Sequence, residues 1–158
     1  MVSGMFLLSI GAVNACGDKA LRIGRGIRFQ RVVNPKSILI YIPSNVTRAS
    51  QVQSLLKKVG HKPYWVQSEN NLSEALNSGK YDLVFTDLGV AQSLTHQIEN
   101  SSSKTVLVAV VSEGTKSEVR AAQKQYNHIV KDPHNAVNYL EAIEEAMRSK
   151  AHALSKKG

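Results

Sequence analysis

Short apolar runs recur along the chain and alternate with segments whose apolar residues are spaced three and four apart. The run Leu83–Phe85 ends beside a lone carboxylate, Asp87, and lies just after Gly79. β-Branched and aromatic residues over so few positions are typical of a strand buried on both faces. Similar runs predict four further strands, at 37–42, 63–66, 104–111 and 128–131.

Helices are predicted between these strands and after the last one. Segment 46–59 carries apolar residues on one helical face, and Gly60 follows where a helix usually ends. Thr115 and Glu118 fit a capping box, so a helix is expected to begin there. The remaining helices are expected at 70–79, at 90–98, and from Asn135 past Met147.

The alternation of strands and helices predicts an α/β fold with a parallel sheet covered on both faces. Right-handed crossovers leave few topologies, and the flavodoxin-like three-layer sandwich with strand order 2-1-3-4-5 is the natural choice. A composition of 42% hydrophobic and 20% charged residues is enough to build the core of one domain. In such sheets chemistry lies outside the carboxyl ends of the strands, which is where Asp87 stands.

The first sixteen residues carry no charge and are mostly apolar and small, and charged residues begin at Asp18. Such a segment is typical of a secretory signal and is shorter than the ~20 apolar residues of a membrane-spanning helix. The ending Val13-Asn14-Ala15-Cys16 resembles a bacterial lipobox, which implies a lipid on Cys16 that holds the protein on a membrane. No basic residue precedes the run, and Asn14 is unusual in a lipobox. The alternative is a buried N-terminal strand or helix with an ordinary core cysteine.

A basic connector at 17–36 separates this segment from the domain. Its arginines recur every three residues between apolar positions, which suits a tether lying on anionic lipid head groups. The alternative is an arm that docks its apolar residues on the domain. The formal net charge of +8 suits an anionic membrane as well as nucleic acid. Because no aromatic stacking cluster accompanies the charge, no nucleic-acid partner is expected.

Residues 37–151 resemble a response-regulator receiver domain of two-component signal transduction. The likeness is carried by the sequence 81–88, by the apolar run 104–111, and by Lys131 with Pro133 nearby. A basic tail, 152–158, follows the resemblance. The stretch from Arg148 to the end is expected to fray.

The resemblance implies a role for three residues. Asp87 matches the aspartate that accepts a phosphoryl group in receivers, and Lys131 matches the lysine that steadies the phosphoryl oxygens. Ser112 is a loose counterpart of the family's hydroxyl residue after the fourth strand.

The chain departs from active receivers at the metal site. Receivers carry adjacent acids after the first strand, whereas this chain has Pro43-Ser44-Asn45 and no carboxylate from Ser37 to Gln67. Mg²⁺ is usually held by one or two carboxylates with phosphate and water, and phosphoryl transfer relies on such a cation. Asp132 would also draw the ammonium of Lys131 away from a phosphoryl group. We therefore expect a degenerate receiver in which Asp87 forms an ion pair with Lys131.

No other chemistry is predicted. The five histidines lack metal spacing, and neither a P-loop nor a dinucleotide fingerprint is present, so no metal or cofactor is expected. We predict a non-catalytic module that contacts a protein partner or a second copy around its fourth and last helices. Its expected location is the periplasmic side of a bacterial membrane. The alternatives are a cytoplasmic receiver phosphorylated on Asp87, and a small-molecule binder at the sheet edge, such as a flavin protein.

Overall fold

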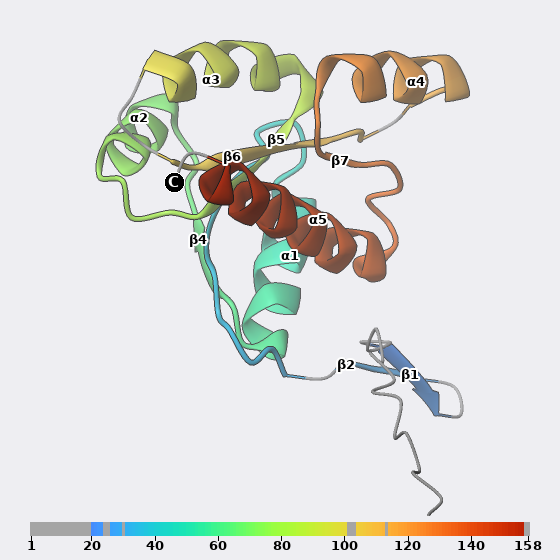
Figure 1. Ribbon diagram of the computed structural model, residues 1–158. Coiled ribbons are helices and arrows are strands. Elements are labelled where there is room, and N and C mark those ends of the chain that lie inside the picture. The colour runs from blue at the N-terminus through green and yellow to red at the C-terminus, as the bar shows by residue number, and fades with distance from the viewer. Residues whose placement is uncertain (1–19, 24–25, 30, 101–103, 113, 157–158) are drawn as a thin grey trace, which may run out of the picture. The chain divides into compact units, whose positions relative to one another are not determined.

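The computed structural model describes residues 20–23, 26–29, 31–100, 104–112 and 114–156 (Figure 1). The chain divides into two compact units, Met1–Gln30 and Arg31–Gly158. The predicted signal and the predicted lipid attachment at Cys16 lie outside the described residues. No described helix is long and apolar enough to cross a membrane.

The first unit contains a β-hairpin. Strand β1, Ala20–Ile23, pairs antiparallel with β2, Gly26–Phe29, and Ala20 lies opposite Phe29. Each strand carries one arginine between two apolar residues, Arg22 in β1 and Arg28 in β2. The sequence analysis recognised the spacing of the arginines in this connector but not the hairpin.

The second unit is built on a five-stranded parallel sheet. Its strands are β3 Ser37–Tyr41, β4 Lys62–Trp65, β5 Leu83–Asp87, β6 Val106–Val110 and β7 Ile129–Val130. They lie in the order β4-β3-β5-β6-β7, which is 2-1-3-4-5 counted within this sheet, so the predicted topology is confirmed. The register places Ile38 beside Leu83 and Leu83 beside Val106.

Five helices cover the two faces of this sheet. They are α1 Val46–Val59, α2 Glu69–Asn77, α3 Leu88–Asn100, α4 Lys116–Gln125 and α5 Ala136–Ser155. In Figure 1, α3 and α4 lie on one side of the strands, and α1 and α5 lie on the other. The prediction that the chain frays from Arg148 is wrong, because α5 continues to Ser155.

The core has two halves because successive strand residues point to opposite faces. On the α2–α3 side, Leu39, Tyr41 and Val84 of the sheet pack with buried residues of both helices. On the other side, Phe85 of β5 meets Tyr139 of α5 edge to face, with ring centroids 5.3 Å apart. This contact fixes α5 against the strand that ends at Asp87.

The turns around α1 show how local sequence sets the ends of the elements. The side chain of Asn45 accepts a hydrogen bond from the backbone N–H of Arg48 and caps the start of the helix. Gly60 ends it in the left-handed conformation, with φ of 97°, which a side chain would strain. The Gly60 N–H donates to carbonyls of the last helical turn.

Both outer strands of the sheet are short or interrupted. Along β4, the Lys62 N–H donates to the Lys36 carbonyl, and the Val66 N–H donates to the Ile40 carbonyl. Because alternate backbone groups of a strand point the opposite way, the backbone nitrogen of Pro63 lies on the outer side of β4. At the opposite edge, β7 has two residues.

Candidate functional site

A cleft opens at the carboxyl edge of the sheet, where β3, β5 and β6 end. Its volume is about 360 Å³, and residues from the loops that follow these three strands line it. The lining residues are Pro43, Ser44, Asp87, Leu88, Gly89, Val90, Val110, Val111, Ser112, Gly114 and Glu118. The predicted location of the candidate site therefore coincides with a cavity.

Asp87 is the last residue of β5 and is 7% exposed. Its Oδ1 accepts a hydrogen bond from the Ser112 hydroxyl at 2.9 Å, and its Oδ2 accepts one from the Ser44 backbone N–H at 3.1 Å. Bonds to an ionised acceptor are about twice as strong as neutral ones. The carboxylate thus joins the loops after β3 and β6 to the end of β5, with one donor on each oxygen.

Ser112 was suggested by the sequence as a loose counterpart of the hydroxyl residue that receivers carry after the fourth strand. In the structure its hydroxyl is hydrogen-bonded to Asp87. It lies two residues beyond the end of β6, at the same edge of the sheet as the end of β5. This adjacency follows from the parallel pairing of β5 with β6, which places Asp87 opposite Val110.

Lys131 is not brought to Asp87. It is exposed, does not line the cleft, and forms no ion pair with Asp87. The predicted ion pair is therefore not formed in the structure. The segment after β7 turns sharply instead: the backbone carbonyl of Asp132 accepts from Asn135 N–H, and its side chain accepts from His134 N–H.

The cleft contains a second carboxylate, Glu118, that the sequence analysis assigned only to a helix cap. The capping box with Thr115 is confirmed: the Thr115 N–H donates to Glu118 at 2.7 Å, and its hydroxyl donates at 2.9 Å. These hydrogen bonds lower the pKa of Glu118. Since helices that follow the strands of such a sheet begin at its carboxyl edge, the capping box itself signalled an acid near the site.

Two carboxylates, Asp87 and Glu118, line the cleft. Mg²⁺ is usually held by one or two carboxylates together with phosphate and water oxygens. Both oxygens of Asp87 and Oε2 of Glu118 accept hydrogen bonds from the protein. Among the described residues, no three His, Cys, Asp or Glu side chains are grouped so that they could hold a metal ion.

Two buried polar side chains, Tyr139 of α5 and Arg48 of α1, lie on the α1–α5 side of the same edge. The hydroxyl of Tyr139 is buried with no hydrogen-bond partner among the described residues, and burial raises its pKa to about 12. Asp87 and Asp132 also raise this pKa, whereas Arg48 opposes them, so all three charges lie within electrostatic reach of the hydroxyl.

Arg48 is only 6% exposed, and its guanidinium forms no hydrogen bond or ion pair within the part of the chain that the structure describes. The sequence analysis missed it. A signal was available, because Arg48 lies at four-residue spacing from the inward-facing Val52 and Leu56.

No protein-family model matches the chain, and no curated protein sequence matches it. Solved structures do. NtrX from Brucella abortus, a structure in complex with ATP, has a TM-score of 0.65 at 18% identity; the match covers 78% of this chain and 29% of the NtrX chain. A CheY-like receiver domain from Methylobacillus flagellatus has a TM-score of 0.56 at 20% identity, covering 72% of this chain and 99% of that domain.

A third similar structure is the receiver domain of Ssk1 from Saccharomyces cerevisiae, solved with the histidine phosphotransfer protein Ypd1. Its TM-score is 0.50 at 20% identity, and the match covers 80% of this chain and 88% of that one. The chain has the fold of response-regulator receiver domains. At these identities the likeness establishes the fold alone.

Proposed function

We propose that the chain is a receiver-like module that acts by contact with another protein, and that Asp87 holds its carboxyl edge together instead of accepting phosphate. The observation that carries the proposal is the pair of hydrogen bonds on Asp87, from Ser112 and from the Ser44 N–H. They tie the loops after β3 and β6 to the end of β5. A carboxylate used in this way keeps the shape of a receiver edge without its reactivity.

The chemistry of phosphoryl transfer supports this assignment. The transferred group carries several negative charges, and a divalent cation normally neutralises them while the attacking oxygen is held in line. The residues after β3 are Ile42, Pro43 and Ser44, none of which is a carboxylate. Lys131 is exposed and lies outside the cleft, so the lysine that receivers use there is also displaced.

The decisive experiment exposes the full chain to acetyl phosphate and Mg²⁺ and measures its intact mass. We expect no phosphoryl adduct. As a matched control, Ser44→Asp returns a carboxylate to the loop after β3, and we expect this variant to bind Mg²⁺ more tightly than the wild type. A phosphoryl adduct on the wild type that is lost in Asp87→Asn would replace our proposal with the alternative, a phosphorylated response-regulator receiver.

The contact surface that we propose is formed by α4 and α5, and its occupant is a protein partner or a second copy of the chain. Most of α4 faces solvent, since Ala122 is its one buried residue. Sedimentation velocity over a range of concentrations separates the two occupants. A mass that rises with concentration, and falls back in Arg120→Glu, indicates a second copy. A monomer at every concentration excludes a second copy and leaves a different protein as the proposed occupant.

We further propose that the chain is exported and held on the periplasmic side of a bacterial membrane by a lipid on Cys16 and by its basic connector. The support is the lipobox-like ending at Cys16 and the arginine spacing of 17–36. Cells fed a palmitate analogue should label the wild type and not Cys16→Ser. An unlabelled wild type in the soluble fraction, still carrying Met1, would place the protein in the cytoplasm.

A further inference from the structure

The amino edge of the sheet, where the strands begin, gathers basic side chains. The same edge receives the ends of α1, α2, α3 and α5, because strands and helices run in opposite directions in such a fold. We call it the basic edge and define it by residues 31–36, 57–62, 74–82, 99–100, 104 and 148–156. Its cations are Arg31, Lys36, Lys57, Lys58, Lys62, Lys80, Lys104, Arg148, Lys150 and Lys156.

Few acids offset this charge. The basic edge contains three carboxylates, Glu74, Asp82 and Glu99. Asp82 is occupied by Lys150 at 3.6 Å and by the backbone N–H of Ser37. The backbone links the neighbouring strand starts directly, with the Lys62 N–H donating to the Lys36 carbonyl. Cations from separate segments are therefore held along one rigid border of the sheet.

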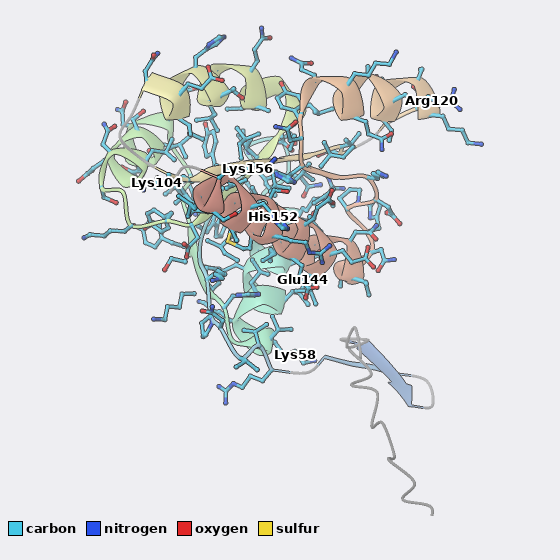
Figure 2. The ribbon with its side chains drawn as sticks, in the orientation of Figure 1. Lys58, Lys104, Arg120, Glu144, His152 and Lys156 are labelled. Carbon is cyan, nitrogen blue, oxygen red and sulfur yellow. The ribbon has the colours of Figure 1, made fainter. Side chains whose placement is uncertain are left out.

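Figure 2 shows how widely the basic edge extends. Lys58 lies at the foot of α1, whereas Lys104 and Lys156 lie on the side where β6 begins and α5 ends. Arg120, on α4, lies away from all three. A cationic surface spread over several elements fits a broad anionic surface better than a single small anion.

Exposed apolar side chains lie among these cations. Two of the exposed large hydrophobic residues belong to the basic edge. They are Val33, with a relative exposure of 101%, and Leu154, with a relative exposure of 51%. Tyr64, at 53%, lies on β4 two residues after Lys62 and stacks on Tyr81. Water-exposed apolar groups within a basic surface are the pattern by which proteins lie on membrane interfaces.

We propose that the basic edge docks the folded domain onto an anionic phospholipid bilayer, with Val33 and Leu154 entering the head-group region. The chain enters the domain at Arg31, so the proposed membrane-attached segment leaves from the same border. The cleft at Asp87, at the opposite edge of the sheet, then faces the aqueous phase. This inference assigns the proposed membrane contact to the folded domain as well. It rests on the proposed function only for the identity of the membrane, the periplasmic side of a bacterial membrane.

The composition of the edge favours lipid over nucleic acid as the anionic partner. Eight of the ten cations are lysines, compact charges that suit mobile head groups, whereas nucleic-acid sites favour the bidentate guanidinium. Val33 and Leu154 have no partner on a phosphate backbone but are suited to the boundary of lipid chains.

The test measures co-sedimentation of the full chain with phosphatidylglycerol-rich vesicles and with neutral phosphatidylcholine vesicles. All proteins carry Cys16→Ser, so that a lipid on Cys16 contributes nothing. One variant adds Lys58→Gln, and its matched control adds Lys131→Gln. Both side chains are exposed, and each substitution removes one positive charge.

We expect the edge variant to bind anionic vesicles about five-fold more weakly, since each cation near such a surface contributes roughly that factor. The Lys131 control should bind like the parent, and raised salt should weaken the parent because it screens the attraction. Equal binding by both variants, or equal binding to neutral vesicles, would overturn the proposal.

A third outcome assigns the surface differently. If the edge variant loses affinity for a DNA or RNA duplex while its vesicle binding is unchanged, the partner is nucleic acid and the proposal is wrong. None of these results depends on Cys16 lipidation or on Asp87 phosphorylation. A failed palmitate labelling or a positive acetyl phosphate experiment therefore leaves the vesicle result to be judged by itself.

Discussion

Replacing Tyr139 by Phe should stabilise the protein. The Tyr139 side chain is 2% exposed, and its hydroxyl has no hydrogen-bond partner among the described residues. A buried polar group left without a partner costs about 1–3 kcal/mol. Phenylalanine removes the hydroxyl and keeps the ring that meets Phe85 edge to face at 5.3 Å. We expect the free energy of unfolding to rise by about 1 kcal/mol at neutral pH, the low end of that range.

The pH dependence gives a second measurement of the same hydroxyl. In the folded protein burial raises the Tyr139 pKa to about 12, whereas an unfolded tyrosine has a pKa of about 10. Between these values the unfolded state loses its proton first, so the wild type loses stability as the pH rises. Phe has no proton to lose. Its advantage should therefore grow above pH 10, by up to about 1.4 kcal/mol per pH unit.

Urea unfolding followed by circular dichroism provides both comparisons. The control is Tyr64→Phe, whose side chain is 53% exposed and which should change stability by less than about 0.5 kcal/mol. If Tyr139→Phe instead lowers stability by about 1 kcal/mol, the hydroxyl has a partner worth a normal hydrogen bond, and the reasoning fails.

Four further substitutions test the fold and its buried groups. Burial lowers the pKa of His128, so the unfolded histidine takes up its proton first as the pH falls below about 6.5. Acid should therefore destabilise the wild type in this range. His128→Gln should lessen this loss of stability in unfolding curves recorded from pH 7 to pH 5. Gly60→Ala should lower the free energy of unfolding by about 1 kcal/mol or more, because φ is 97° at this position and the new Cβ would lie 3.1 Å from the Arg31 side chain. In contrast, Gly89→Ala lies in a helix with open space around the new Cβ and should raise the melting temperature. Thr115→Ala removes the capping box and should cost about 1 kcal/mol by thermal melting; an unchanged melting temperature would mean that the cap is not formed in solution.

The parallel sheet was predictable because its strands are buried on both faces and therefore form continuous apolar runs. All five residues of β5 are buried, and the run 104–111 contains β6. The hairpin was missed since each of its strands has four residues and a single arginine, too few to show the alternation typical of a strand. The helical tail was missed because it lacks an inward-facing apolar stripe: none of residues 148–155 is buried, although the helix continues to Ser155.

The candidate site was predictable in location more than in detail. Asp87 and Ser112 meet because they follow adjacent parallel strands, and strand order can be inferred from the apolar pattern. The position of Lys131 could not be inferred in the same way. It depends on the turn at Asp132–Asn135, which is set by hydrogen bonds between the backbone and the Asp132 side chain. The backbone N–H of Ser44 is a contact that no side-chain pattern encodes.

The borders of the sheet also limit how this protein can assemble. Pro63 places a ring where β4 would otherwise offer a donor to an incoming strand, and β7 is too short to template one. Continuous sheets running from one molecule into the next, the route to fibres and to swapped strands, are therefore disfavoured on both sides. Association of the second unit through the borders of its five-stranded sheet is therefore disfavoured, which leaves its helix surfaces as the more available contacts.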